Sequence, residues 1–109
     1  MNSLNGYIVV NDIAGSSAVV STGNNLLIND LLKFGFQPNA EKLCIDIESD
    51  EHRQIIVKYL ISKGALFSSG KDWSPEELVK YYKEIGKLNC EFKSISWTAP
   101  GVYKIISNP

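Results

Sequence analysis

The hydrophobic pattern of the first half of the chain predicts a hairpin, a helix and a strand. Residues 7–10 and 18–20 are two short β-type runs separated by turn-forming residues, which indicates an N-terminal hairpin. Residues 26–34 carry leucine and phenylalanine at helical spacing and therefore predict a helix. Residues 36–39 are typical of a turn, and residues 43–48 then alternate between apolar and polar side chains, as a half-buried strand does.

The second half of the chain predicts two more helices. Residues 49–63 form the first, because acidic residues suit its opening turn and an apolar stripe follows. Residues 74–77 read Ser-Pro-Glu-Glu, a capping box with proline at the first helical position, so the next helix is expected to run from there to about Lys87. Trp73 fits a hydrophobic staple with Leu78. The residues expected on the buried faces of the two helices are Ile55, Ile56, Tyr59, Leu60, Leu78, Tyr81 or Tyr82, and Ile85.

The end of the chain predicts two strands, at residues 90–98 and 103–107, around a turn that contains Pro-Gly. Phe92 and Ile95 have opposite parity, which predicts a bulge in the first of these strands. Whether residues 65–67 form another short strand stays open. The order ββαβα(β)αββ therefore indicates one small α/β (α+β) domain over residues 1–109. We expect a mixed sheet of four or five strands, with about three helices mainly on one face.

Composition places the chain among ordinary globular domains. It has 109 residues, of which 44% are hydrophobic and 21% charged, enough to bury a core without covalent staples. The start of the chain does not resemble a signal peptide, and the apolar runs are too short to span a bilayer, so we expect a cytoplasmic protein with reduced thiols. Two cysteines and one histidine predict neither a disulfide scaffold nor a structural zinc site, and no cofactor is expected.

Charge is divided unevenly along the chain. The formal net charge is −1, but residues 1–51 carry seven acids and two lysines, whereas residues 52–109 carry nine bases and five acids. The densest acidic cluster consists of Asp46 and Glu48, which share one face of the alternating strand, and of Asp50 and Glu51, which open the next helix. Three interpretations stay open: a solvated strand end with dipole-favouring acids, a docking patch for a basic partner, or a divalent-metal site. The first is the most ordinary of the three.

Two other groups of side chains could bind a partner. Lys80, Lys83 and Lys87 form a stripe on the third expected helix, which could meet phosphate but is more typical of a wet helix face. Trp97 and Tyr103 lie on either side of the terminal turn. They are expected either to pair across the two strands or to form an aromatic contact surface.

The residue types needed for catalysis are scarce. The chain has neither of the common glycine-rich phosphate-binding motifs. His52 is the only histidine, and a nucleophilic pair would need Cys44 or Cys90 beside it in the fold. Alternation predicts that Cys44, Asp46 and Glu48 share the open face of the sheet, so a site there would use these side chains.

Three classes of function remain. The favoured one is a small protein-binding factor, of the kind seen in bacterial or phage inhibitor, immunity and antitoxin-like proteins, that occludes a basic partner such as a nuclease toxin. The alternative is a small enzyme or ligand-binding domain that uses the open sheet face. The third is a weak nucleic-acid binder, against which the net charge argues. The oligomeric state stays open. The residues expected to bind the partner are Asp46, Glu48, Asp50, Glu51, Trp97 and Tyr103.

Overall fold

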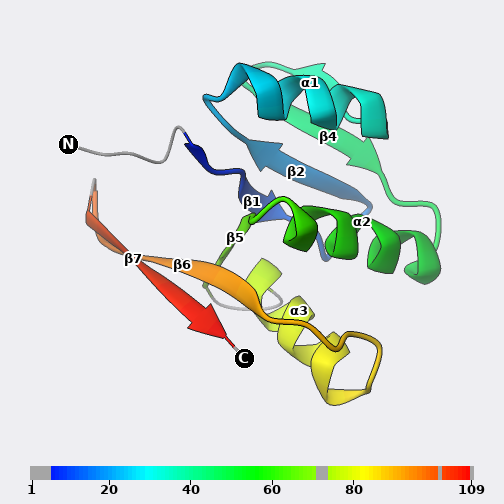
Figure 1. Cartoon of the computed structure of the whole chain (residues 1–109), viewed down its shortest axis with the longest axis vertical. Coiled ribbons are helices and arrows are strands. Elements are labelled where there is room, and N and C mark those ends of the chain that lie inside the picture. The colour runs from blue at the N-terminus through cyan, green and yellow to red at the C-terminus, as the bar shows by residue number, and fades with distance from the viewer. Residues whose placement is uncertain (1–5, 71–73, 101, 109) are drawn as a thin grey trace.

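The computed structural model describes residues 6–70, 74–100 and 102–108 as one α/β domain with three helices and a single mixed sheet of seven strands (Figure 1). The strands are β1 (Val9–Asp12), β2 (Ser17–Ser21), β3 (Gln37–Asn39), β4 (Lys42–Asp46), β5 (Leu66–Ser68), β6 (Phe92–Ala99) and β7 (Val102–Asn108). The helices are α1 (Asn25–Phe34), α2 (Asp50–Ser62) and α3 (Pro75–Glu84).

The sheet has more strands than the four or five that the sequence predicts. Its order is β3-β4-β2-β1-β5-β6-β7, so both terminal hairpins join one continuous sheet. The strand that the pattern left open, β5, is present inside the sheet, between β1 and β6. The added strand is β3, where a turn was expected. Because residues 37–39 contain Pro38, the sequence pattern did not indicate a strand there. Proline is tolerated in β3 because an edge strand needs no backbone donor on its outer side.

The mixed character of the sheet is confirmed. β1 pairs with β5 and β5 with β6 in parallel, and the other neighbouring strands are antiparallel. The connections from β4 to β5 and from β5 to β6 each contain a helix, as connections into parallel strands usually do. In Figure 1, the loop from β4 to α2 and the end of β6 that leads toward β7 lie on opposite sides of the molecule.

Side-chain caps define the starts of the helices. Asn24 accepts hydrogen bonds from the amides of the first turn of α1, and Ser49 does the same for α2. The capping box of α3 is confirmed, with both reciprocal hydrogen bonds between Ser74 and Glu77. Trp73 lies outside the described residues, so its staple stays a prediction. α3 ends at Glu84, before the expected Lys87, where the chain turns through a glycine with positive φ.

The main core lies between the helices and one face of the sheet and contains residues of all three helices. The predicted buried faces of α2 and α3 are only partly right. In α2, Ile55 is 56% exposed, whereas Val57 is buried. In α3, Tyr82 is the buried one of the two tyrosines named by the prediction, but Val79 is buried and Ile85 is 46% exposed. Ile55 and Val57 flank Ile56 on opposite sides of the helix, so periodicity alone does not choose between them.

The opposite face of the sheet carries a second, smaller cluster of Val9, Leu66 and Ile95, against which Tyr7 and Tyr103 pack. The bulge predicted for the first strand of the terminal hairpin corresponds to a register shift in β6, but the shift does not lie between Phe92 and Ile95, the residues that suggested it. β6 pairs regularly with β7 from Phe92 to Trp97, and the register shift comes only between Trp97 and Ala99. Phe92 belongs to the main core and Ile95 to the second cluster, so their opposite parity reflects burial on both faces. Among the described helices, none is long and apolar enough to cross a membrane.

Candidate partner-binding site

The four predicted acidic residues lie at one corner of the molecule, which we call the acidic corner: Asp46, Glu48, Asp50 and Glu51. Asp46 ends β4, Glu48 lies in the following loop, and the other two form the first turn of α2. All four residues are exposed. Their placement on α2 also favours the helix, because carboxylates at a helix N-terminus complement its dipole.

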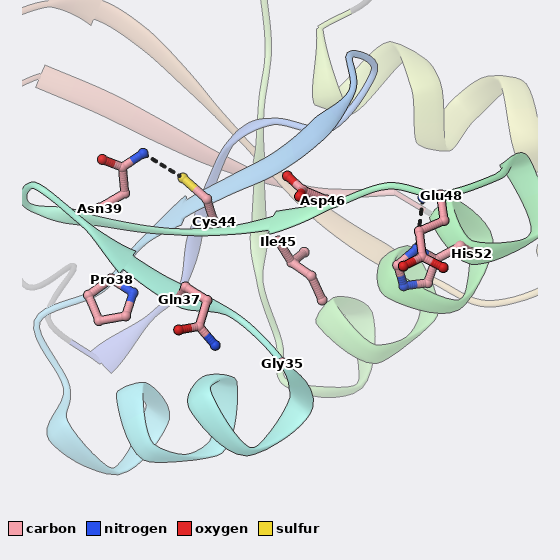
Figure 2. Close-up of a pocket in the computed structure, with 9 residues that line it drawn as sticks. All are labelled: Gly35, Gln37, Pro38, Asn39, Cys44, Ile45, Asp46, Glu48 and His52. Atoms are coloured by element: carbon pink, nitrogen blue, oxygen red, sulfur yellow. Dashed lines mark hydrogen bonds between the residues drawn. The ribbon is translucent and has the colours of Figure 1, made fainter.

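A hollow of about 520 Å³ opens beside the acidic corner (Figure 2). Figure 2 shows the Asp46 carboxylate between the thiol of Cys44 and the pair formed by Glu48 and His52. None of its described lining residues is a lysine or an arginine, so the charge of the hollow comes from its two carboxylates. Those lining residues are Gly35, Gln37, Pro38, Asn39, Cys44, Ile45, Asp46, Glu48 and His52.

Asp50 differs from the other acids of the corner because the fold already uses its carboxylate. The hydroxyl of Tyr82 donates to Asp50 Oδ1 at 2.6 Å, and the side chains of Gln54 and Arg53 donate at 3.0 and 3.2 Å. The bond from Tyr82, followed by the one from Gln54, lowers the pKa of Asp50 below 3.8. Burial, followed by the bond to Asp50, raises the pKa of Tyr82 to about 12.

Arg53 balances the charge of Asp50 and ties the corner to the first hairpin. Its Nε donates to the carbonyl oxygen of Ile13 at 3.0 Å, and its Nη2 donates to that of Gly15 at 2.9 Å. Asp46 interacts only with a neutral partner among the described contacts, the hydroxyl of Ser17, which donates to it at 3.3 Å. The negative charge available to a partner is therefore that of Asp46, Glu48 and Glu51.

Cys44 and His52 line the same hollow, but their hydrogen bonds go to other groups. The side-chain amide of Asn39 donates to Cys44 Sγ at 3.6 Å. The backbone amide of Glu48 donates to His52 Nδ1 at 3.1 Å, so that nitrogen is an acceptor and the proton of the neutral ring lies on Nε2. The described bonds thus hold the imidazole by its Nδ1 and do not join it to the thiol. Within residues 6–70, 74–100 and 102–108, no three histidine, cysteine, aspartate or glutamate side chains form a group that could hold a metal ion.

Trp97 and Tyr103 form a cross-strand pair, which is one of the two alternatives that the sequence left open. They stand opposite each other on β6 and β7, with ring centroids 5.4 Å apart in an edge-to-face arrangement. Trp97 remains 47% exposed and lines a shallow hollow of about 290 Å³ together with Tyr7 and Ser21.

The structure does not bring this aromatic pair to the acidic corner. Three strands separate β4 from β6, which places the two groups about 19 Å apart across the sheet at the usual strand spacing. The two groups are also displaced along the strand direction. Asp46 pairs with Ser17 at the start of β2, whereas Trp97 shares a hollow with Ser21 at the end of that strand. The six predicted residues therefore belong to two separate surfaces.

The lysine stripe is partly occupied by contacts within the chain. Lys80 Nζ lies 3.7 Å from Glu76 Oε2, and Lys83 donates a hydrogen bond to the carbonyl oxygen of Cys90. Lys87 follows the end of α3 rather than extending the helix. These contacts are those of a solvated helix face.

Sequence reasoning missed the side chains of β3. Gln37 and Asn39 line the hollow only because β3 pairs with β4, and a three-residue strand that contains proline carries no alternation that would reveal it. Comparisons of the chain with protein-family models, with curated proteins and with solved structures found no match. The fold and the site thus define an α/β domain with an acidic, hollowed corner and a separate aromatic hairpin.

Proposed function

We propose that this protein is a small protein-binding factor, an inhibitor or immunity (antitoxin-like) protein, that covers a basic partner such as a nuclease toxin with its acidic corner. The observation that carries the proposal is the hollow beside that corner, which has two carboxylates and no described lysine or arginine in its lining. A lysine or arginine side chain of the partner would enter it and meet Asp46 and Glu48. Inhibition follows by occlusion, because the covered basic site no longer reaches its anionic substrate.

The charge of the acidic corner supports the binding of a basic partner. The ion pairs among the described residues use Asp50, Asp30 and Glu76, and none of them neutralises Asp46, Glu48 or Glu51. Uncompensated surface charge of one sign steers an oppositely charged partner and speeds its association. The rate should therefore fall as salt rises, because exposed charges are screened.

The size of the hollow supports a second candidate, a site for a small cationic molecule. Small-molecule sites usually occupy about 300–1,000 Å³, and this hollow, at about 520 Å³, falls in that range. Its polar lining, from β3, β4 and the start of α2, would then bind the ligand's positive group. Asp46 and Glu48 contribute in both cases, so the two candidates differ in whether the bound species is a protein.

The test is affinity capture from lysate of the host cell with three tagged proteins. These are the natural chain, the double variant Asp46→Lys/Glu48→Lys, and the control Glu84→Lys/Glu91→Lys, which makes the same change in net charge at two exposed residues outside the corner. We expect one stoichiometric basic protein on the natural chain and the control, and none on the corner variant. The captured protein should also lose its own activity when the natural chain is added. Equal capture by all three proteins would contradict the proposal. Capture of none, with a cationic metabolite retained by the natural chain alone, would favour the second candidate.

A further inference from the structure

The two edges of the sheet differ in how well they are protected. β3, at one edge, has three residues with Pro38 in the middle, and both features discourage another strand from pairing with it. β7, at the other edge, has seven residues, no proline, and Lys104 as its only charge. Figure 1 shows β7 as the outermost strand on its side of the molecule. As an edge strand, β7 presents one side of its backbone to a further strand.

Both faces of β7 carry exposed apolar side chains near its middle. Ile105 stands opposite Ile95, on the face of the second cluster, and Ile106 stands opposite Ser94, on the helix-bearing face. Each isoleucine is 37% exposed. A long edge strand that is apolar on both sides is the kind that natural proteins normally blunt or cover.

We propose that β7 is a self-association surface, on which β7 of a second copy pairs antiparallel about a twofold axis at Ile105. This pairing joins the two seven-stranded sheets edge to edge. Ile105 is the central residue of β7, so an axis there engages the whole strand. Main-chain hydrogen bonds supply the attraction, as they do in other cases of strand addition.

The side chains fit this register. With the axis at Ile105, Lys104 faces Ile106 of the partner subunit, and its alkyl chain can cover that side chain while the ammonium reaches water. Tyr103 faces Ser107 of the partner subunit. No like charges stand directly opposite each other, and the two Ile105 side chains meet on the axis.

We favour a second copy of this chain as the binding partner of β7. An antiparallel strand can pair with its own copy, and the resulting dimer has no further edge that would extend the sheet. Twofold pairing of β7 satisfies both edges at once, and the opposite edge, blocked at Pro38, cannot extend the sheet into a fibre. The strand is about 24 Å long, so its contact is far smaller than the ~800 Å² per partner of tight complexes. The dimer should therefore be weak and depend on concentration. The acidic corner, several strands away on β4 and α2, stays accessible, so this inference does not rest on the proposed function.

The test is the solution mass of the purified protein by sedimentation equilibrium, between about 10 μM and about 1 mM, the range in which a contact this small would associate. The average mass of the natural chain should rise toward twice 12.1 kDa. Ile105→Lys alone and Ile105→Glu alone should remain monomeric, because each places like charges on the axis. An equimolar mixture of the two should recover the dimer through a Lys–Glu pair. Leu26→Lys, at a residue 75% exposed on α1, is the matched control and should dimerise like the natural chain.

Circular dichroism of each variant checks that the fold is retained. Recovery of the dimer by the mixture also shows that both variants are folded, because unfolded chains would not regain pairing when mixed. A natural chain that remains monomeric over the whole range would overturn the inference and leave the β7 edge to a strand from another protein. A dimer that survives unchanged in Ile105→Lys would overturn it as well, because its interface would then lie elsewhere.

Discussion

The hydrogen bond from Tyr82 to Asp50 should be one of the stronger single polar contacts in the fold, and Tyr82→Phe removes it with almost no change in shape. The bond joins α3 to the start of α2 and is 2.6 Å long, as expected when a hydroxyl donates to a carboxylate. Hydrogen bonds to charged groups contribute about 1.5–3 kcal/mol. The Asp50 side chain is 57% exposed, so water partly replaces the lost donor. The contribution of this bond should therefore lie at the low end of that range.

We therefore expect Tyr82→Phe to lower the free energy of unfolding by about 1.5 kcal/mol, which corresponds to a fall in Tm of about 6 °C for a domain of this size. The assay is urea denaturation of four proteins: the natural chain, Tyr82→Phe, Asp50→Ala and the double variant. The coupling energy between the two positions should be about 1–1.5 kcal/mol, because each single change removes the same bond. A coupling energy within about 0.3 kcal/mol of zero would refute the reasoning.

The same bond predicts a pH dependence with a definite sign. The pKa of Asp50 is lower in the folded protein than its ordinary value of 3.8, so the stabilisation is fully present above pH 3.8. It is lost as the pH falls through the lower, folded-state pKa. The difference in stability between the natural chain and Tyr82→Phe should therefore shrink at acid pH. At the other extreme, absorbance titration of tyrosine should show a component near pH 12 that Tyr82→Phe removes.

Two further changes test the helix ends. Ser74→Ala should lower the free energy of unfolding by about 1 kcal/mol, since it removes the cap of α3, and an unchanged urea midpoint and slope would contradict the role of the capping box. Gly35→Ala should cost about 2 kcal/mol, because Gly35 has a φ of 130° and an added Cβ would lie 3.2 Å from Ile45 Cδ1. Gly64→Ala is its control, with a φ of 73° and no atom within 4 Å of the added Cβ, and should cost less by the same measurement.

Local sequence signals predicted the local structure well. The capping box at Ser74 is where the sequence places it, because a cap depends on residues within one turn of each other. The alternation in β4 correctly assigned Leu43 to the core and Asp46 to the surface for the same reason. The pairing of Trp97 with Tyr103 also followed from a short turn.

Features that depend on distant residues were not predictable from the chain. β3 exists because β4 lies beside it, and its Pro38 suggests a turn when it is considered alone. The burial of Ile95 depends on Val9 and Leu66, which come from two other strands. In the candidate site, the order of charges along the chain located the acidic corner. The engagement of Asp50 by Tyr82 could not be foreseen, because 32 residues separate them.

The central claim is that the acidic corner binds a basic partner, and the most direct test is calorimetry with the partner identified by capture. The affinities of the natural chain, Asp46→Lys/Glu48→Lys and Glu84→Lys/Glu91→Lys should be compared at low and at physiological salt. We expect the corner variant to bind at least about 100-fold more weakly, because each reversal turns an attraction into a repulsion. The control should bind within about threefold of the natural chain, since its charges are screened by salt and lie away from the contact. Equal affinities for the corner variant and the control would contradict the account.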